Sequence, residues 1–213
     1  MLQRHGLAFV LSGPSGSGKT SLCRAARDQL PGLTYSVSHT TRSPRPGEVD
    51  GEHYHFVDEE RFEAMIAAGE LLEWAEVYRH RYGTARATVL SLLQAGRDVI
   101  LDLDIQGSLA LRAAYPHTRL LFVLPPSRTV LEERLRGRRT DPGTEIDHRL
   151  SKALVELEAL DKFDYFVEND EFARALQEVG AIVSAERQAV SHLVEPTPTV
   201  RLLFGGSHGQ SHS

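Results

Sequence analysis

The fold is decided by residues 7–20, which read Leu7-Ala8-Phe9-Val10-Leu11-Ser12-Gly13-Pro14-Ser15-Gly16-Ser17-Gly18-Lys19-Thr20. The stretch begins with a short, continuous apolar run, which is typical of a buried strand in a parallel sheet. Its second part, Gly13 to Thr20, matches the phosphate-binding pattern G-x-x-x-x-G-K-[ST] in full. Helical spacing of apolar residues follows at once, so the pattern lies between a predicted strand and a predicted helix, as this motif requires.

Each part of this loop has a chemical role in holding phosphate groups. The glycines allow the backbone to curl so that N–H groups point inward, and the N-terminus of the helix adds positive potential. Lys19 is expected to reach the β and γ phosphates of a nucleoside triphosphate, and the Thr20 hydroxyl is expected to bind Mg²⁺. The predicted ATP-binding residues of the loop are Gly13, Pro14, Ser15, Gly16, Ser17, Gly18, Lys19 and Thr20. The motif alone does not show which reaction follows.

Outward from the loop, predicted strands and helices alternate along most of the chain. Strands are predicted near 34–39, 53–57, 71–77, 99–103, 120–124 and 163–167. Helices are predicted near 22–30, 58–68, 84–94, 127–137, 146–160 and 171–190, with turns at 79–83 and 141–144. This alternation predicts an α/β fold with a mostly parallel central sheet. Shorter strands interrupt the rhythm between about 37 and 90, which indicates an inserted lobe.

Composition narrows the class of protein further. The chain has 213 residues and a formal net charge of −5, which fits one domain with a tail and argues against a bulk nucleic-acid binder. Cys23 is the single cysteine, so an intramolecular disulfide and a cysteine-based metal cage are excluded. No run approaches the roughly 20 apolar residues of a membrane span, and we expect a cytoplasmic protein without membrane contact. Proline, glycine and serine in 195–213 predict a disordered tail.

Two aspartates end the predicted strand at 99–103. Ligands of parallel α/β sheets bind at the carboxyl ends of strands, and a carboxylate there can hold Mg²⁺ through water. We assign this role to Asp102. For Asp104, which precedes Ile105-Gln106-Gly107, a binding role and a simple cap on the next helix are equally open.

A run of arginines follows the strand at 120–124. Arg134 and Arg138 are four residues apart and share a helix face, and Arg149 lies on the next predicted helix. Mobile arginines that close on a transferring phosphoryl group are worth roughly 10³–10⁵ in rate. The loop at 141–144 would let this piece move as a lid. The alternative is a solvated basic helix end.

Beyond these patterns, the chain resembles a known family. The longest matching stretch is Ser36-Val37-Ser38-His39-Thr40-Thr41-Arg42-Ser43-Pro44-Arg45-Pro46-Gly47-Glu48-Val49-Asp50-Gly51, followed by Tyr54 and Phe56. Further matches are Leu72-Glu73-Trp74-Ala75, Tyr82-Gly83-Thr84, residues 101–107, 134–138 and Asn169-Asp170. In this order, and over nearly all of residues 6–190, the sequence is similar to guanylate kinases.

The resemblance implies a fold, a reaction and a set of roles. The fold would be a three-layer P-loop fold within one domain, 1–194. Its core would comprise about 6–36, 91–126 and 163–190. A GMP-binding lobe would lie at about 37–90, and a helical lid at about 127–162. The reaction would transfer the γ-phosphoryl group of Mg²⁺-ATP to GMP, and also to dGMP, with no partner beyond these substrates in a monomer or homo-oligomer. GMP would be bound by Ser38, Arg42, Arg45, Tyr54, Glu73, Tyr82, Thr84 and Asp104. Catalysis would rest on Lys19, Arg42, Arg134, Arg138 and Arg149, with Asn169 near the adenine.

Two rival functions remain at this point. One is a P-loop kinase with another acceptor, such as a sugar phosphate, against which the guanine set of Ser38, Glu73 and Thr84 argues. The other is a guanylate-kinase-like binding module without catalysis, which needs no intact phosphate loop. Glu73 is the most informative residue of the set, because a charge inside the apolar run 71–75 is costly unless it is paired.

Overall fold

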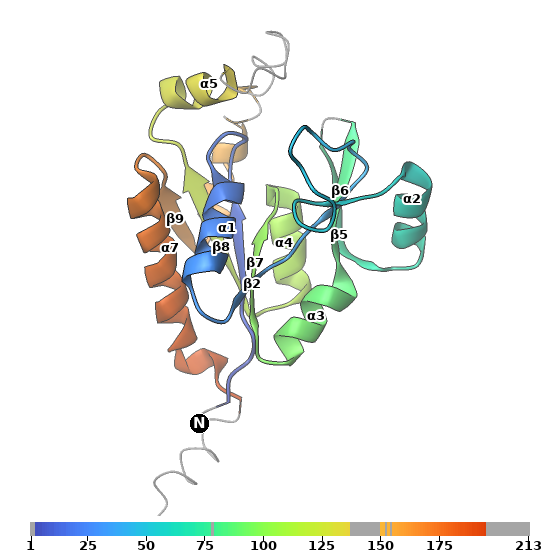
Figure 1. Ribbon diagram of the computed structural model, residues 1–213. Coiled ribbons are helices and arrows are strands. Elements are labelled where there is room, and N and C mark those ends of the chain that lie inside the picture. Colours follow the sequence, from blue (N-terminus) through green and yellow to red (C-terminus); the bar gives the residue numbers. More distant parts are fainter. Residues whose placement is uncertain (1–2, 78, 137–149, 152, 154, 195–213) are drawn as a thin grey trace, which may run out of the picture.

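The computed structural model describes residues 3–194 apart from 78, 137–149, 152 and 154 (Figure 1). The phosphate-binding motif lies between a strand and a helix, as predicted. The strand is β1 (Ala8–Ser12), and the helix is α1 (Lys19–Gln29). The motif therefore forms the turn from the central sheet into the first helix.

β1 is the central strand of a five-stranded sheet whose neighbouring strands are all parallel. The strand order is β2 (Leu33–Tyr35), β7 (Asp98–Asp102), β1, β8 (Thr118–Leu124) and β9 (Tyr165–Glu168). The predicted α/β fold with a mostly parallel sheet is confirmed. Because ligands bind at the carboxyl ends of such strands, the loops after β1 and β7 mark the functional edge.

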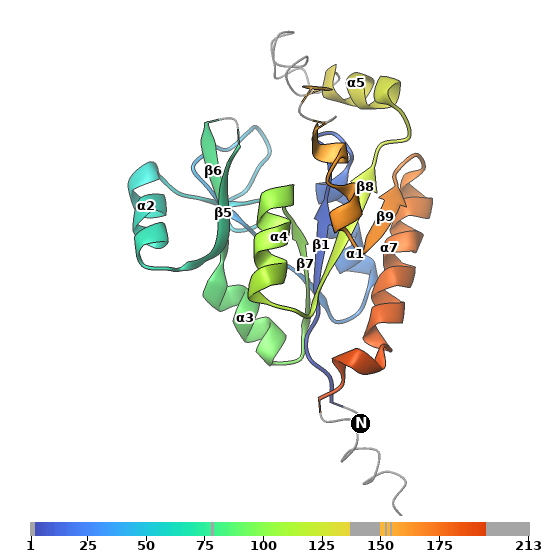
Figure 2. The same cartoon turned by 180° about the vertical axis from the view of Figure 1, so that it is seen from behind.

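Helices cover both faces of this sheet (Figures 1 and 2). They are α1 and α7 (Phe172–Arg187) on one face, and α3 (Arg86–Gln94) and α4 (Ile105–Ala114) on the other. Successive side chains of a strand point to opposite faces, so Phe9 and Leu11 pack with the first pair of helices, and Ala8 and Val10 with the second. All of these side chains are fully buried. The phosphate-binding turn is therefore anchored in two apolar cores.

A second, mixed sheet folds from the middle of the chain. Its strand order is β4 (His55–Phe56), β3 (His39–Thr40), β6 (His80–Ala85) and β5 (Leu71–Val77). β3 and β4 are parallel, and the other pairs are antiparallel. The helix α2 (Glu59–Ala67) packs on this sheet through Phe62 and Met65, and Asp58 caps it by accepting a hydrogen bond from the Arg61 N–H at 2.7 Å.

Two predictions of local structure are wrong. The sequence predicts one strand over Thr34 to His39, but β2 ends at Tyr35 in one sheet and β3 begins at His39 in the other. The sequence also predicts a turn at 79–83 and a helix from Thr84, where the structure has the strand β6. β6 pairs with both β3 and β5. Pairing on both sides outweighs local signals, because strand preference depends strongly on context.

The segment expected to act as a lid is described only in part. The helix α5 (Arg128–Arg136) begins after Ser127, and its buried Leu131 and Leu135 pack with Leu150 and Ala153. The predicted loop at 141–144 and the predicted tail at 195–213 lie outside the described residues. Within the described part of the chain, no helix is both long enough and apolar enough to cross a membrane.

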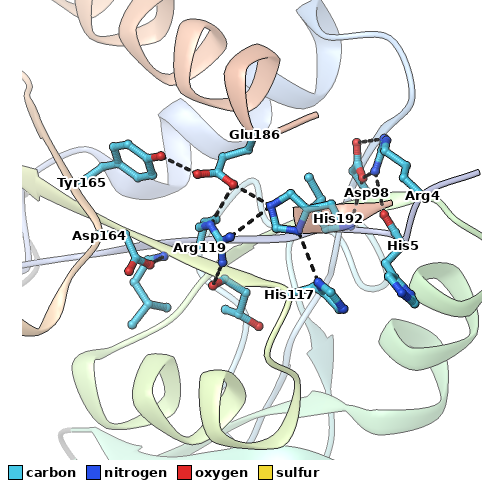
Figure 3. A network of polar contacts seen from close by, with 12 residues as sticks. Arg4, His5, Asp98, His117, Arg119, Asp164, Tyr165, Glu186 and His192 are labelled. Atoms are coloured by element: carbon cyan, nitrogen blue, oxygen red, sulfur yellow. Dashed lines mark hydrogen bonds and ion pairs between the residues drawn. The ribbon is translucent and has the colours of Figure 1, made fainter. Parts of the chain in front are cut away.

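A network of polar side chains closes the opposite edge of the main sheet (Figure 3). Asp98, which is 1% exposed, accepts hydrogen bonds from Arg4 and Arg187 at 2.6–2.7 Å. Glu186 accepts from Arg119 at 2.8 Å and contacts His192 at 2.7 Å. Backbone hydrogen bonds also join residues 3 and 5 to 194 and 192. We interpret the network as a structural tie between the first and last described segments.

Candidate active site

One cavity of about 260 Å³ lies at the functional edge of the main sheet and extends to the second sheet. It is lined by Gly13, Ser15, Gly16, Gly18, Lys19, Thr20, Ser21, Ser38, Arg45, Tyr54, Glu73, Ala75, Tyr82, Gly83, Asp102, Leu103, Asp104 and Glu156. Most of the predicted site residues therefore meet in one place, although they come from segments far apart in the sequence. The cavity has two chemically different ends.

The first end is the phosphate-binding loop. Gly18 has a φ of +94°, which favours glycine, and a Cβ atom there would overlap the Asn169 side-chain amide. That amide donates a hydrogen bond to the Ser17 carbonyl at 2.7 Å, so Asn169 stabilises the conformation of the loop. The Lys19 ammonium group donates to the carbonyls of Gly13 and Pro14 at 2.8 and 3.1 Å. The loop is thus folded with its lysine held at the cavity.

Thr20 and Asp102 form a hydroxyl–carboxylate pair beside this loop. The Thr20 hydroxyl donates to Asp102, which ends β7 next to β1. Both groups are hard oxygen donors of the kind that Mg²⁺ prefers, and that ion usually keeps several water ligands as well. Among the described residues, no group of three or more His, Cys, Asp or Glu side chains is arranged for a metal. The pair therefore suits an ion that is shared with phosphate and water.

The second end of the cavity is built around the buried carboxylate of Glu73. Glu73 is 9% exposed, and one of its carboxylate oxygens accepts a hydrogen bond from the Thr84 hydroxyl at 2.6 Å. The other oxygen lies against Gly107, where an added Cβ would stand 2.5 Å from it. Burial raises the pKa of Glu73 to about 7, and the nearby Asp104 carboxylate acts in the same direction. This end is an acceptor site whose charge is only partly compensated.

Glu73 is therefore expected to destabilise the fold at alkaline pH. Its pKa is raised from the usual 4.5 to about 7, so its contribution to stability is lost as the pH rises from about 4.5 through 7. At pH 8 the difference amounts to about 3 kcal/mol. Glu73→Gln should raise Tm at pH 8 by roughly 5–10 °C, and the gain should shrink toward pH 5. Thermal unfolding of both proteins across this range checks the prediction, and a pH-independent gap would contradict it.

A loop from β3 to β4 carries the predicted arginines of the second end. Arg45 lines the cavity together with Tyr54 and Tyr82, whose rings meet edge to face at 5.8 Å. Burial raises the pKa of Tyr54, so its hydroxyl stays protonated and able to donate. Arg42 does not line the cavity: its guanidinium lies 5.4 Å from the Tyr54 ring and is paired with Glu48 at 2.9 Å.

Asp104 has the capping role that the sequence left open, and its binding role stays a prediction. Its carboxylate caps α4 by accepting a hydrogen bond from the Gly107 N–H at 2.7 Å, and the residue also lines the cavity. Thr84, in contrast, is fully buried and does not line the cavity, so it reaches the site only through its hydrogen bond to Glu73. Ser38 lines the cavity as predicted.

Arg134, on α5, is connected to the phosphate-binding loop through Asn169. It donates to the carbonyl of Asn169 at 2.9 Å, and the Asn169 side chain in turn holds the loop at Ser17. Neither Arg134 nor Asn169 lines the cavity in this structure. The other two predicted lid arginines, Arg138 and Arg149, lie outside the described residues.

Sequence reasoning assigned no role to several residues that the structure brings to the site. Glu156 lines the cavity, and Gly107 leaves room for the Glu73 carboxylate. Glu48 holds Arg42. Gly107 and Glu48 lie in stretches that carry the family resemblance, which was the only available signal for them; for Glu156 the sequence offers none.

A phosphate-binding loop that shares one cavity with a separate acceptor lobe defines a P-loop phosphotransferase acting on small molecules. The comparisons with known proteins give the particular family. The sequence model of guanylate kinase matches residues 6–186, which is most of the chain. The chain belongs to the guanylate kinase family.

Individual relatives agree with this assignment. A guanylate kinase of Idiomarina loihiensis is 47% identical over 189 residues, covering 88% of this chain and 90% of the relative. That of Alkalilimnicola ehrlichii is 46% identical over 202 residues, covering 94% and 99%. The crystal structure of guanylate kinase from Anaplasma phagocytophilum superposes with a TM-score of 0.83 at 28% identity, covering 97% of this chain and all of that one.

Proposed function

We propose that the two ends of the cavity hold the two substrates of one phosphoryl transfer. The chain is a guanylate kinase, an enzyme that phosphorylates GMP to GDP with ATP. This assignment of one substrate to each end is supported by one observation: the phosphate-binding loop and the buried Glu73 line the same cavity. ATP phosphates belong to the first end, and GMP belongs to the second.

Guanine recognition rests on Glu73. The base presents two adjacent donors, its N1–H and its exocyclic amine, and one carboxylate accepts from both. The Thr84 hydrogen bond supports this role because it fixes the orientation of the carboxylate. Ser38 and Asp104 complete the base site from the cavity wall. Adenine lacks the N1–H and would leave Glu73 buried and underpaired, and such sites reject the poorer analogue by roughly 10⁴–10⁵.

The phosphate of GMP is proposed to bind at the loop between β3 and β4, which carries Arg42 and Arg45. Arg45, Tyr54 and Tyr82 line the same cavity as Glu73, and the Arg42 guanidinium lies 5.4 Å from the Tyr54 ring. Two arginines supply charge and two phenolic hydroxyls donate without adding charge. The acceptor oxygen of GMP is thereby held in line with the γ-phosphoryl group of ATP, and positioning of this kind supplies much of the rate in phosphoryl transfer.

The ATP phosphates are proposed to bind to the backbone N–H groups of residues 13–20 and to Lys19. Arg134, Arg138 and Arg149 are the residues proposed to neutralise the charge that spreads over the group in flight, and Asn169 lies near the adenine. Thr20 and Asp102, the latter through water, would hold Mg²⁺, as their adjacent oxygens suit this ion. When bound, the ion neutralises charge on the triphosphate. Closure of the lid excludes water and limits wasteful hydrolysis of ATP.

The wider proposals follow from the same residues. None of the residues assigned to GMP is assigned to the ribose 2′-hydroxyl, so dGMP is proposed as a second acceptor. Nucleic acids and membranes are not among the proposed partners, and the chain is proposed to work in the cytoplasm as a monomer or homo-oligomer. One domain, 1–194, carries the core, the lobe at about 37–90 and the lid at about 127–162.

The decisive experiment is to measure ADP formation from Mg²⁺-ATP with GMP, dGMP, AMP, CMP and UMP in turn. Turnover confined to GMP and dGMP supports the assignment of the second end to guanine. Equal turnover with AMP would contradict the role of Glu73, and a lack of turnover with dGMP would contradict only the second acceptor. Omission of Mg²⁺ should abolish all turnover.

The raised pKa of Glu73 also predicts a pH dependence of base binding. Guanine needs the ionised carboxylate, whose pKa is about 7 in the free enzyme. Guanosine is the cleaner probe, because the GMP phosphate itself titrates near pH 6. Guanosine affinity should rise about tenfold between pH 6 and pH 8, with proton release on binding below pH 7. Calorimetry in two buffers measures both, and Glu73→Gln should flatten the profile; an unchanged affinity in the parent enzyme would contradict the prediction.

A further inference from the structure

Glu48 is hydrogen-bonded to both of the arginines that are proposed to bind the phosphate of GMP, Arg42 and Arg45. Its two carboxylate oxygens each lie 2.9 Å from Arg42 Nη2, and one of them also accepts from the Arg45 backbone N–H at 2.8 Å. The side chains of Arg42 and Glu48 are only 10% and 17% exposed. One carboxylate thus joins the guanidinium of one arginine to the backbone of the other.

The pair is held from several sides. Arg42 Nη1 donates to the Ser43 carbonyl at 2.7 Å, and the guanidinium lies 5.4 and 5.8 Å from the rings of Tyr54 and Phe56. Burial alone would raise the pKa of Glu48, but the hydrogen bonds from Arg45 and Arg42 hold that pKa below its usual value. The carboxylate is therefore ionised throughout the neutral range.

The donors used by these contacts leave part of the arginine for a ligand. A guanidinium has five N–H donors in a rigid, planar fork. Glu48 takes Nη2, the Ser43 carbonyl takes one proton of Nη1, and a further side-chain hydrogen bond joins the guanidinium to Tyr82, which lines the cavity. We propose that Glu48 is a positioning residue, which fixes Arg42 and the Arg45 backbone so that the remaining donors are pre-organised for the phosphate of GMP.

This inference rests on the proposed phosphate-binding role of Arg42 and Arg45. Glu48 does not touch GMP in this arrangement, so its effect passes through the arginines. Loss of a charged hydrogen bond of this kind corresponds to roughly ten- to a hundredfold in affinity. The competing possibility is that Glu48 occupies the place of the phosphate and holds Arg42 away from it. Removal of Glu48 would then tighten GMP binding.

The test compares GMP with guanosine, which lacks only the phosphate, by calorimetry on the full chain. Four variants are needed: Glu48→Ala, Glu48→Gln, Arg42→Ala and the double variant Glu48→Ala/Arg42→Ala. Glu70→Ala is the matched control, because it removes another ion pair of the lobe, Arg61–Glu70 at 2.7 Å, whose partners are both well exposed. Thermal unfolding shows which variants remain folded, and Glu48→Gln is the conservative alternative should Glu48→Ala be unstable.

We expect Glu48→Ala to weaken GMP roughly ten- to a hundredfold and to leave guanosine unchanged. We expect Glu48→Gln to have a smaller effect in the same direction, and Glu70→Ala to have none. In the Arg42→Ala background, loss of Glu48 should add little. KM for GMP should rise far more than kcat falls, with KM for ATP unchanged.

Three results would overturn the inference: GMP binding that is unchanged or tighter in Glu48→Ala, an equal loss for guanosine, or full additivity in the double variant. The phosphate site itself is tested separately by Arg42→Ala. If that variant binds GMP and guanosine as the parent does, the role proposed for Arg42 is wrong, and the role of Glu48 falls with it. If only Arg42→Ala is impaired, the phosphate site stands and the positioning role fails.

Discussion

Replacement of Lys19 by alanine is expected to lower kcat for GMP phosphorylation roughly 10³-fold. The Lys19 ammonium group lies at the cavity, held by the carbonyls of Gly13 and Pro14. Negative charge spreads over the transferring phosphoryl group, and a fixed cation in a water-excluding site stabilises that charge more than it stabilises the ground state. The effect should therefore appear in kcat more than in KM for GMP. Steady-state ADP formation at saturating substrates measures it.

Two further measurements make the result specific to the ammonium group. Lys19→Arg keeps the charge but not its compact shape, so it should recover only part of the lost rate. Guanosine binding, measured without ATP, should be unaltered in both variants because the base site is at the other end of the cavity. If kcat of Lys19→Ala remains within tenfold of the parent, charge neutralisation by this lysine is not a main source of the rate.

The second large effect is expected from Glu73→Gln, which should lower kcat/KM for GMP roughly 10³-fold. The amide of glutamine keeps one acceptor but turns a donor toward the donors of guanine. Two charge-assisted hydrogen bonds are thus replaced by one neutral bond and one unfavourable contact. The selectivity for GMP over AMP should be lost as well, because AMP is rejected by leaving the same carboxylate without hydrogen-bond donors. Steady-state ADP formation with GMP and with AMP measures both kcat/KM for GMP and the selectivity between the two nucleotides.

Glu76→Gln is the matched control for this change. Glu76 lies on the same strand, β5, but is exposed and does not line the cavity. The same chemical change there should leave GMP turnover and selectivity intact. Glu73→Gln should not harm stability, since it removes a carboxylate whose burial is unfavourable at neutral pH. Retained selectivity in Glu73→Gln would mean that other residues read the base.

The sequence by itself was sufficient to predict the class of fold and the family. The phosphate-binding loop is a contiguous stretch, and its glycines and lysine act through local backbone geometry, so residues 13–20 are informative without any tertiary contact. The apolar runs that become β1, β7 and β8 are buried on both faces, and this makes their composition distinctive. The resemblance to guanylate kinases, confirmed by the family match over 6–186, also rests on contiguous stretches.

Local sequence was a poorer guide inside the mixed sheet. The strand β6 looks like a turn followed by a helix start, because Gly83 is unfavourable in a strand and interrupts the strand preference of Tyr82 and Thr84. Its extended form is imposed by pairing with β3 on one side and β5 on the other. Short strands such as β3, which pairs with β4 on one side and β6 on the other, gain their stability from neighbours rather than from their own residues.

Only the tertiary structure decided how the second end of the cavity works. Leu71 and Leu72 pack in different apolar clusters, the register of β5 shifts between Leu71 and Glu73, and Glu73 lies at the cavity. Thr84 from β6 and Gly107 from α4 then enclose its carboxylate. The pairing of Arg42 with Glu48 was equally hidden. The physical reason is common to these cases: the charge and orientation of a buried side chain depend on desolvation and on hydrogen-bond partners, which are supplied by segments distant in the sequence.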